Sequence, residues 1–253
     1  MNILNAIREW LIRMLTRNDV KKTYGKDVAI STSMQNNIQF WANMYSGRAD
    51  WLDKDLGIHS LRLEQAITRE FVNTVINEMS VTISNKKLDD IFRTATKWLN
   101  INLQRGLATG AMVIKPLGAD KVQFVSQDAF VPIEYDVNGR LIKVIFPEIK
   151  QVSESTWLTR LEFHSLDYKL GLTITNRAYM SSSPNELGHE IPLVSVDEWA
   201  SLPAEITYPD MLRPAFGYYV NPIDNTVDNS KAGVSFFAPA VDIIRKADIQ
   251  AIS

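Results

Sequence analysis

The hydrophobic positions in the first half of the chain recur at the spacing of α-helices. Between residues 60 and 79 an apolar residue occurs at every fourth position: Leu63, Ile67, Phe71, Val75 and Met79. This spacing places all five on one face of a helix. The stretch 31–47 opens with helix-capping residues and ends at a glycine, and the stretch 85–110 also ends at a glycine. The pattern predicts helices within residues 31–110.

Beyond residue 110 the pattern changes to short runs rich in β-branched and aromatic residues, separated by turn residues. Such runs predict strands, here over 111–117, 121–126, 129–136, 140–151, 156–167 and 170–180. The pair Asn138-Gly139 is a strong signal for a hairpin turn. A further strand is predicted over 81–84 and a short capped helix over 195–202. The stretch 203–233 is rich in Pro, Asn and Asp and is predicted to be extended and irregular.

The chain closes on a second apolar stripe at helical spacing: Phe236, Ala240, Ile243, Ala247 and Ala251. Ser235 is predicted to cap this helix, and Pro239 falls in its first turn, where proline is tolerated. No Gly, Asn or Pro follows to end the helix. We therefore expect the sequence to stop within a helix and to be a piece of a longer protein.

The first residues also form an amphipathic pattern, with Ile3, Ile7, Leu11 and Leu15 on one face. Charged residues interrupt the apolar positions and no small-residue cleavage site follows, so this is not a signal peptide. The segment predicts a basic terminal helix that packs on a neighbouring subunit or domain, and a membrane-surface helix is the alternative. Residues 18–30 are polar and are predicted to be a linker.

The order of the predicted elements gives the fold class. Helices come first, then a mostly antiparallel sheet, an extended arm and the start of a long helix, which is α+β. This order argues against a doubly wound nucleotide-binding fold. The predicted division is a basic helix and linker over 1–30, an α+β domain over 31–215, and an arm with the final helix over 216–253. Within the middle block, helices occupy 31–110, a sheet 111–180, and a loop with a short helix 181–215.

Composition removes several classes of function. The net charge is −2 and there is no cysteine, so there is no overall basic field for nucleic acid and no thiolate chemistry. The three histidines, His59, His164 and His189, are isolated, and the chain lacks the phosphate-binding and nucleophile motifs. We expect no catalytic residue, no metal site and no cofactor, and a structural protein rather than an enzyme.

The acidic and aromatic residues do not change that expectation. Asp53, Asp55 and Glu64 have the spacing of calcium-loop positions 1, 3 and 12, but Gly57 and Ile58 stand where a ligand and the turn glycine are needed. The tryptophans at 41, 51, 98 and 157 lack the interleaved cations of a base-stacking platform. They are predicted to lie in the core or in a packing surface between subunits. Apolar helix faces without a partner in the chain are expected to be buried against other copies.

Five stretches together resemble one protein family. They are "NIQFWANMYSGRADWL" at 37–52, "LNINLQRGLATGAMVIKPL" at 99–117, "FVSQDAFVPIEYDVNGRL" at 124–141, "PLVSVDEW" at 192–199 and "FGYYVNPIDNTVDNSKAGVSFFAPAVDIIRKAD" at 216–248. In order and spacing they resemble the portal proteins of tailed double-stranded DNA phages, in particular the type of long-tailed phages of Gram-positive hosts. The stretches extend over nearly the whole chain.

The resemblance implies the outer wing of a portal with the start of its stem. It implies a homo-oligomeric ring, a dodecamer, at one capsid vertex of the virion, assembled in the host cytoplasm. Double-stranded DNA would pass through the central channel without sequence specificity. The implied partners are the terminase large subunit, head-completion and adaptor proteins, capsid and scaffold proteins, and no membrane. We expect this region to supply subunit contacts rather than to hold DNA, because a strongly basic channel would stall translocation.

The resemblance also implies which residues form a subunit interface or stem junction: Asn221, Pro222, Gly233, Ser235, Phe236, Ile243, Ala247 and Asp248. Chains of this family continue into stem, clip and crown segments, so the channel-lining and motor-docking residues are expected beyond residue 253. The alternative is another minor head or connector protein of a phage, which would lack the long stem. A hydrolase or nuclease would require clustered carboxylates or histidines.

Overall fold

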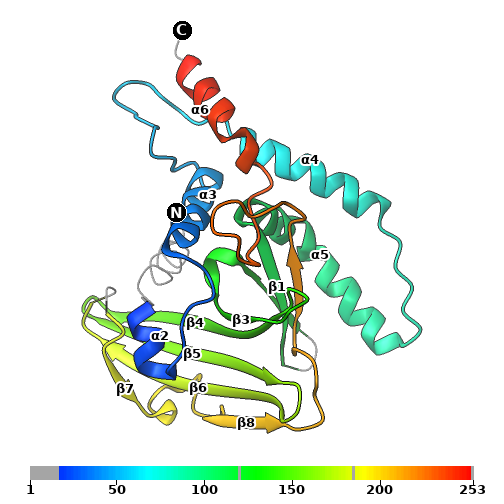
Figure 1. The fold of residues 1–253 in the computed structure, drawn as a ribbon, viewed down its shortest axis with the longest axis vertical. Helices are drawn as coiled ribbons and strands as arrows, with labels where there is room; N and C mark the ends of the chain where they lie inside the picture. Colours follow the sequence, from blue (N-terminus) through cyan, green and yellow to red (C-terminus); the bar gives the residue numbers. More distant parts are fainter. Residues whose placement is uncertain (1–16, 119–120, 184–185, 252–253) are drawn as a thin grey trace. The chain divides into compact units, whose positions relative to one another are not determined.

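A computed structural model of the chain describes residues 17–118, 121–183 and 186–251 (Figure 1). The predicted α+β class is confirmed, because helices come first, antiparallel strands follow and a helix closes the chain. The amphipathic helix predicted over residues 3–15 lies outside the described residues.

The chain forms two compact units, each built from separate stretches of sequence. Unit 1 comprises residues 1–31 and 128–215, and unit 2 comprises residues 32–127 and 216–253. The chain passes between the units near residues 31 and 215, where the sequence suggested boundaries, and also at 127, which the sequence did not indicate. The block expected over 31–215 is therefore divided between the units.

In the described residues, unit 1 is a sheet on which helix α2 (Arg17–Tyr24) packs. Its elements are α2 (Arg17–Tyr24), β3 (Val131–Tyr135), β4 (Leu141–Ser153), β5 (Thr156–Asp167), β6 (Gly171–Ser181), β7 (His189–Ile191), the 3₁₀ helix η2 (Leu193–Ser195) and β8 (Glu205–Tyr208). The strand order is β3-β4-β5-β6-β7, with β8 also paired to β6, and all these pairs are antiparallel. The hairpin predicted at Asn138-Gly139 is confirmed, and the Asp136 carboxylate accepts from the backbone of Asn138 and Arg140.

Helix α2 corrects the linker predicted over residues 18–30. Val20 and Tyr24 lie one turn apart, Val20 is fully buried, and the Tyr24 ring packs on Phe163 of β5 at 4.7 Å between centroids. Arg177 of β6 donates to the backbone carbonyl of Thr23. The helix is only 8 residues long, so its apolar spacing is too short to recognise, and packing on the sheet stabilises it.

Unit 2 contains the longer helices and a small sheet. Its elements are α3 (Thr32–Tyr45), α4 (Leu63–Glu78), α5 (Lys86–Thr109), β1 (Ala111–Leu117), β2 (Lys121–Ser126), β9 (Gly217–Val220), the 3₁₀ helix η3 (Ala238–Ala240) and α6 (Val241–Gln250). The 3₁₀ helix η1 (Gln127–Ala129) spans the passage into unit 1. The sheet order is β2-β1-β9, again antiparallel. The single sheet expected over 111–180 is therefore two sheets in two units.

Three local predictions are wrong. Residues 81–84 form no strand but connect α4 to α5, since no neighbouring strand pairs with them. Residues 195–202 form successive turns rather than a helix. The Trp199 side chain is buried, and the backbone N–H of Trp199 donates to the Val196 carbonyl. The final helix does not begin at Ser235; η3 comes first and α6 starts at Val241.

Candidate functional site

The predicted interface and stem residues all belong to unit 2, and four of them gather where α5 ends. We call this place the junction: Leu107, Gly110, Gln127, Asn221, Gly233, Ser235 and Phe236. The last carbonyls of a helix have no partner within the helix itself. At the end of α5 the segment 221–236 supplies donors to them from a distant part of the chain.

Asn221 is the central donor of the junction. Its side chain is buried, and its amide nitrogen donates to the carbonyls of Leu107 and Val234, each at 2.8 Å. The backbone N–H of Asn221 donates to the carbonyl of Gly110 at 2.9 Å. The backbone N–H of Phe236 donates to the carbonyl of Leu107, also at 2.9 Å. One asparagine thus joins α5 to the segment that leads to α6.

Gln127 forms the second link, between the end of β2 and the same segment. Its side-chain amide donates to the carbonyls of Thr109 (2.9 Å) and Gly233 (2.8 Å), and its side-chain oxygen accepts from the N–H of Gly233 at 2.9 Å. Gln127 is buried. Because these bonds lie away from water, loss of one partner would leave another group buried and unsatisfied.

Two glycines make this close approach of backbone segments compatible with the fold. Gly110 caps α5 with φ +107°, a conformation that side chains other than glycine rarely adopt. A Cβ atom on Gly110 would lie 2.1 Å from the carbonyl oxygen of Gly233, and one on Gly233 would lie 1.9 Å from that of Gly110. Any side chain at either position would separate the two segments.

The loop between Asn221 and Gly233 is ordered by Asn225. Its buried side chain donates to the Asp228 carboxylate at 2.8 Å and accepts from the backbone of Val227 at 3.1 Å. Its amide also lies within hydrogen-bond distance of Ser230. These local bonds hold the loop in the shape that brings Gly233 back to Gln127.

Helix α6 is attached through Asp248. This buried carboxylate accepts from the indole N–H of Trp51 at 2.9 Å and from the backbone N–H of Leu61 at 2.8 Å. Glu64 lies nearby, and burial, followed by the neighbouring Asp248 charge, raises its pKa above the usual range. Arg245 lies over the Trp51 ring, 5.9 Å from its centroid.

The predicted site residues therefore have different environments. Asn221, Gly233, Ser235 and Asp248 are buried, and Phe236 is half-buried against Phe71 of α4 at 4.5 Å between ring centroids. Pro222 and Ile243 are exposed and Ala247 is half-buried. The buried residues of α6 are Ile244 and Asp248. Within α6 the buried face is therefore displaced by one residue from the predicted positions Ile243 and Ala247.

Comparison with known proteins adds no relative. No model of a known protein family matches this chain, and no curated protein matches it with significant similarity.

Within the described residues, no three His, Asp or Glu side chains form a group that could hold a metal ion. None of the helices in the described part of the chain combines the length and apolar character that a bilayer crossing requires.

The sequence alone did not identify the residues that form hydrogen bonds with the candidate site, which are Leu107, Gln127, Trp51 and Leu61. Each acts through a bond to a residue more than a hundred positions away, and periodicity along the chain carries no information on such contacts. The one sequence signal for Leu107, Gln127 and Trp51 is that all three fall in stretches singled out in the sequence analysis.

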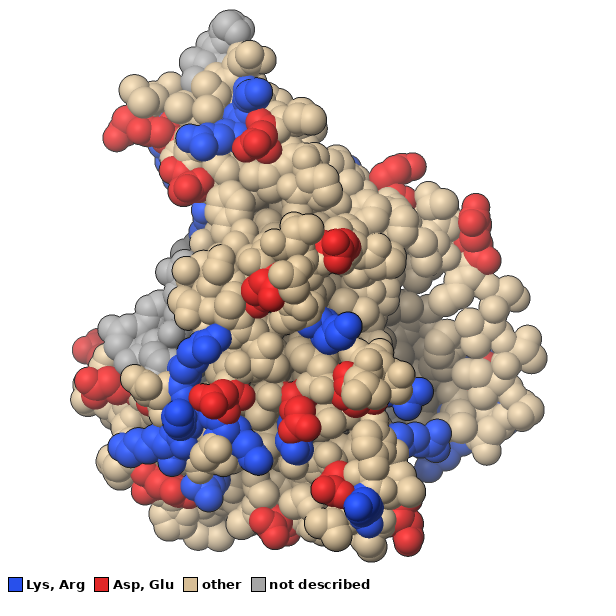
Figure 2. Space-filling model, viewed as in Figure 1, with Lys and Arg blue, Asp and Glu red and all other residues tan. Residues whose placement is uncertain are grey.

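A second feature of unit 2 is the apolar surface on α4 and α5. The stripe through Phe71, Val75 and Met79 remains 36–39% exposed. The buried face of α4 is displaced by one residue and consists of Glu64, Thr68 and Val72. Residues 70–78 of α4 include two acidic residues, Glu70 and Glu78, and no Lys or Arg. Acidic side chains are visible over this part of the molecule in Figure 2.

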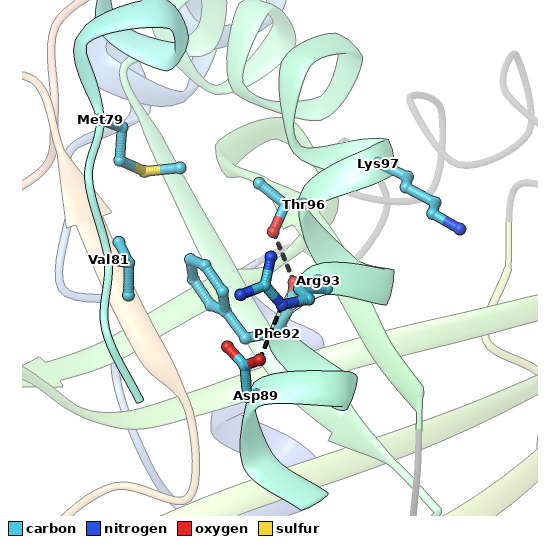
Figure 3. Close-up of a pocket in the computed structure, with 7 residues that line it drawn as sticks. All are labelled: Met79, Val81, Asp89, Phe92, Arg93, Thr96 and Lys97. Carbon is cyan, nitrogen blue, oxygen red and sulfur yellow. Dashed lines mark hydrogen bonds and ion pairs between the residues drawn. The ribbon is translucent and has the colours of Figure 1, made fainter. Parts of the chain in front are cut away.

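Two grooves flank α5. One, of about 460 Å³, lies between α5 and the residues after α4 and is lined by Met79, Val81, Asp89, Phe92, Arg93, Thr96 and Lys97. Figure 3 shows Met79 and Val81 facing Phe92, with the Asp89–Arg93 ion pair of 2.7 Å at its edge and Lys97 directed away.

The other groove, of about 360 Å³, lies between α5 and the β1–β2 hairpin and is lined by Ile91, Thr94, Ala95, Trp98, Asn102, Leu117, Lys121, Val122 and Phe124. Trp98 is 62% exposed and Leu117 is 54% exposed. Large apolar side chains left in water in this way mark surfaces that bind other proteins.

Proposed function

We propose that this protein is a subunit of a phage portal, a ring at one capsid vertex of the virion through which double-stranded DNA is packaged and ejected. Its partners would be further copies of itself, the terminase large subunit, head-completion and adaptor proteins, and capsid and scaffold proteins. Assembly would take place in the host cytoplasm.

One observation carries this proposal. Four of the five stretches that resemble portal proteins contribute to the contacts around the junction and α6: Trp51 from 37–52, Leu107 and Gly110 from 99–117, Gln127 from 124–141, and Asn221, Gly233 and Asp248 from 216–248. These contacts support the proposal because the stretches that carry the expected resemblance come together in the fold. In portal proteins this region is the connection of the wing to the stem.

The apolar surfaces of unit 2 also support a self-assembling protein. A structural ring requires contacts between copies and no catalytic group, and α4 and α5 carry exposed apolar residues on surfaces that a single copy leaves in water. The charges on the chain nearly balance, with a net charge of −2. Such a balance suits a conduit from which DNA must be released.

The test is electron microscopy of the protein expressed from its complete gene. We expect rings with a central hole in negative stain. Particles of the size of a single copy, without rings at any protein concentration, would contradict the proposal. A ring that lacks the long stem would instead favour a minor head or connector protein.

A further inference from the structure

The two grooves of unit 2 lie on opposite sides of α5. The residues of α5 that line the first are Asp89, Phe92, Arg93, Thr96 and Lys97, and those that line the second are Ile91, Thr94, Ala95, Trp98 and Asn102. At 100° per residue, the mean directions of the two sets around the helix axis are about 170° apart. Met79 and Val81, which follow α4, line the first groove and so cannot reach the second groove of their own chain.

The end of α4 and the residues after it have the composition of a segment that binds an apolar groove with a basic rim. Val75, Met79 and Val81 are between 36% and 42% exposed. Between residues 70 and 82 the charged residues are Glu70 and Glu78, both acidic. We call residues 75–81 the α4 end.

The second groove has the complementary composition. Trp98, Leu117 and Phe124 provide large apolar side chains, and Lys121 is the one charged residue among those that line it. Glu78 is the charged residue of the α4 end and Lys121 is that of the groove, so the two surfaces are complementary in charge as well as in hydrophobicity. The volume of the groove is sufficient for several apolar side chains.

We propose that the α4 end of one copy packs into the groove between α5 and the β1–β2 hairpin of a second copy. Since each copy presents the α4 end on one side of α5 and the groove on the other, the contact joins different surfaces and is head-to-tail. Such a contact propagates from copy to copy and closes into a ring when the rotation per copy permits. This inference names the contact within the proposed portal ring, and it rests on that proposal only for the closure of the ring.

The absence of cysteine from the chain makes the test direct. Met79→Cys, Trp98→Cys and the double variant are treated with a short bis-maleimide reagent and separated by denaturing electrophoresis. We expect a ladder of dimers, trimers and larger products from the double variant. We expect dimers from a mixture of the two single variants, and no product from either single variant alone.

Two outcomes would overturn the proposal. Dimers from Trp98→Cys alone or from Met79→Cys alone would indicate a two-fold contact between identical surfaces. The absence of products from both the double variant and the mixture would show that the α4 end and the groove do not meet. The matched control is Met79→Cys with Val137→Cys, because Val137 is 94% exposed in unit 1 and is expected to give no ladder.

A second pair, which keeps Trp98, guards against a variant that fails to fold or that associates weakly because Trp98 has been replaced. Val81→Cys with Leu117→Cys places the reactive groups at the same predicted contact and is judged by the same products. Thermal unfolding of each variant is compared with that of the parent chain. Trp98→Ala is expected to weaken association about tenfold or more, as for aromatic residues at the centre of an interface, without loss of folded structure.

Electron microscopy separates this inference from the proposed function. If the protein forms rings but the Met79→Cys, Trp98→Cys variant gives no cross-linked products, the proposed contact is wrong and the portal proposal is unaffected. A ladder from a protein that forms open filaments rather than rings would support the contact and contradict the portal.

Discussion

Single residues decide whether the junction can form. Gly110 was recognisable in the sequence as the end of a long helix, but the need for glycine at 233 was not, because it depends on the backbone of Gly110 lying against it. Asn221 and Gln127 likewise look like ordinary polar residues until the structure shows which carbonyls they reach.

The close approach of the two glycines gives the first prediction. Gly110→Ala is expected to lower the free energy of unfolding by more than about 3 kcal/mol, because the new Cβ would collide with the Gly233 carbonyl and the residue has positive φ. The matched control is Gly57→Ala, where φ is +72° and no atom lies within 4 Å. That change is expected to cost about 1 kcal/mol. Equal losses for the two variants, measured by urea denaturation, would contradict the account.

A second prediction concerns Glu64. Burial, and then the charge of Asp248, raises the pKa of this carboxyl above its usual value of 4.5. A raised pKa in the folded state means that the stabilising contribution of Glu64 is complete below pH 4.5 and is lost as the pH rises through the folded-state pKa. Glu64→Gln is therefore expected to gain stability relative to the parent chain as the pH rises from 4.5 towards neutrality.

The measurement is the urea midpoint of both proteins across that pH range, with Glu70→Gln as the control. Glu70 is an exposed acid on the same helix. If the difference between Glu64→Gln and the parent chain stayed constant with pH, or fell as the pH rose, the assigned environment of Glu64 would be wrong.

At the scale of elements, the sequence predicted the long strands well and their partners poorly. The predicted spans of β1 and β2 and that of β5 coincide with those observed, since alternation and turn residues mark their ends. The short strands β7, β8 and β9 have three or four residues each and were missed, because so few residues show no period. Alternation also does not say which strand pairs with which, so the division into two sheets was not foreseen.

Helix α4 shows why a correct helix can have an unexpected buried face. Its apolar stripe steps by four residues, but the side buried in the unit is Glu64, Thr68 and Val72. The hydrophobic effect favours burial of the stripe, and a single copy buries it only in part, since Phe71, Val75 and Met79 remain 36–39% exposed. The mismatch is the physical argument for a partner on this face.

The third prediction concerns the connection between α5 and the segment leading to α6. Asn221→Ala removes the donor to the Leu107 and Val234 carbonyls and leaves both buried. The expected loss in the free energy of unfolding is about 2–4 kcal/mol. Asn36→Ala, at an exposed position of α3, is the control and is expected to stay within about 0.5 kcal/mol of the parent chain. A loss for Asn221→Ala no larger than that of the control would show that the junction does not stabilise the unit.

At the scale of the whole molecule, the central claim is that the protein functions as an assembly of identical copies around an axis. The chain has a junction that fastens α6 to its own unit, and it has apolar surfaces on α4 and α5 that its own unit does not cover. The first feature accounts for stability within a copy, and the second is the basis on which we propose association between copies. The sequence led to the expectation of partner copies, but it did not point to the exposed side of α4 and the Trp98 groove, which we propose as the contact surfaces.

The most direct test of this claim is the mass of the protein expressed from its complete gene, measured by native mass spectrometry over a range of concentrations. We predict one closed oligomer, a fixed multiple of the chain mass that stays constant as the protein is concentrated. A single-copy mass at every concentration, or a mass that rises without limit, would contradict the account.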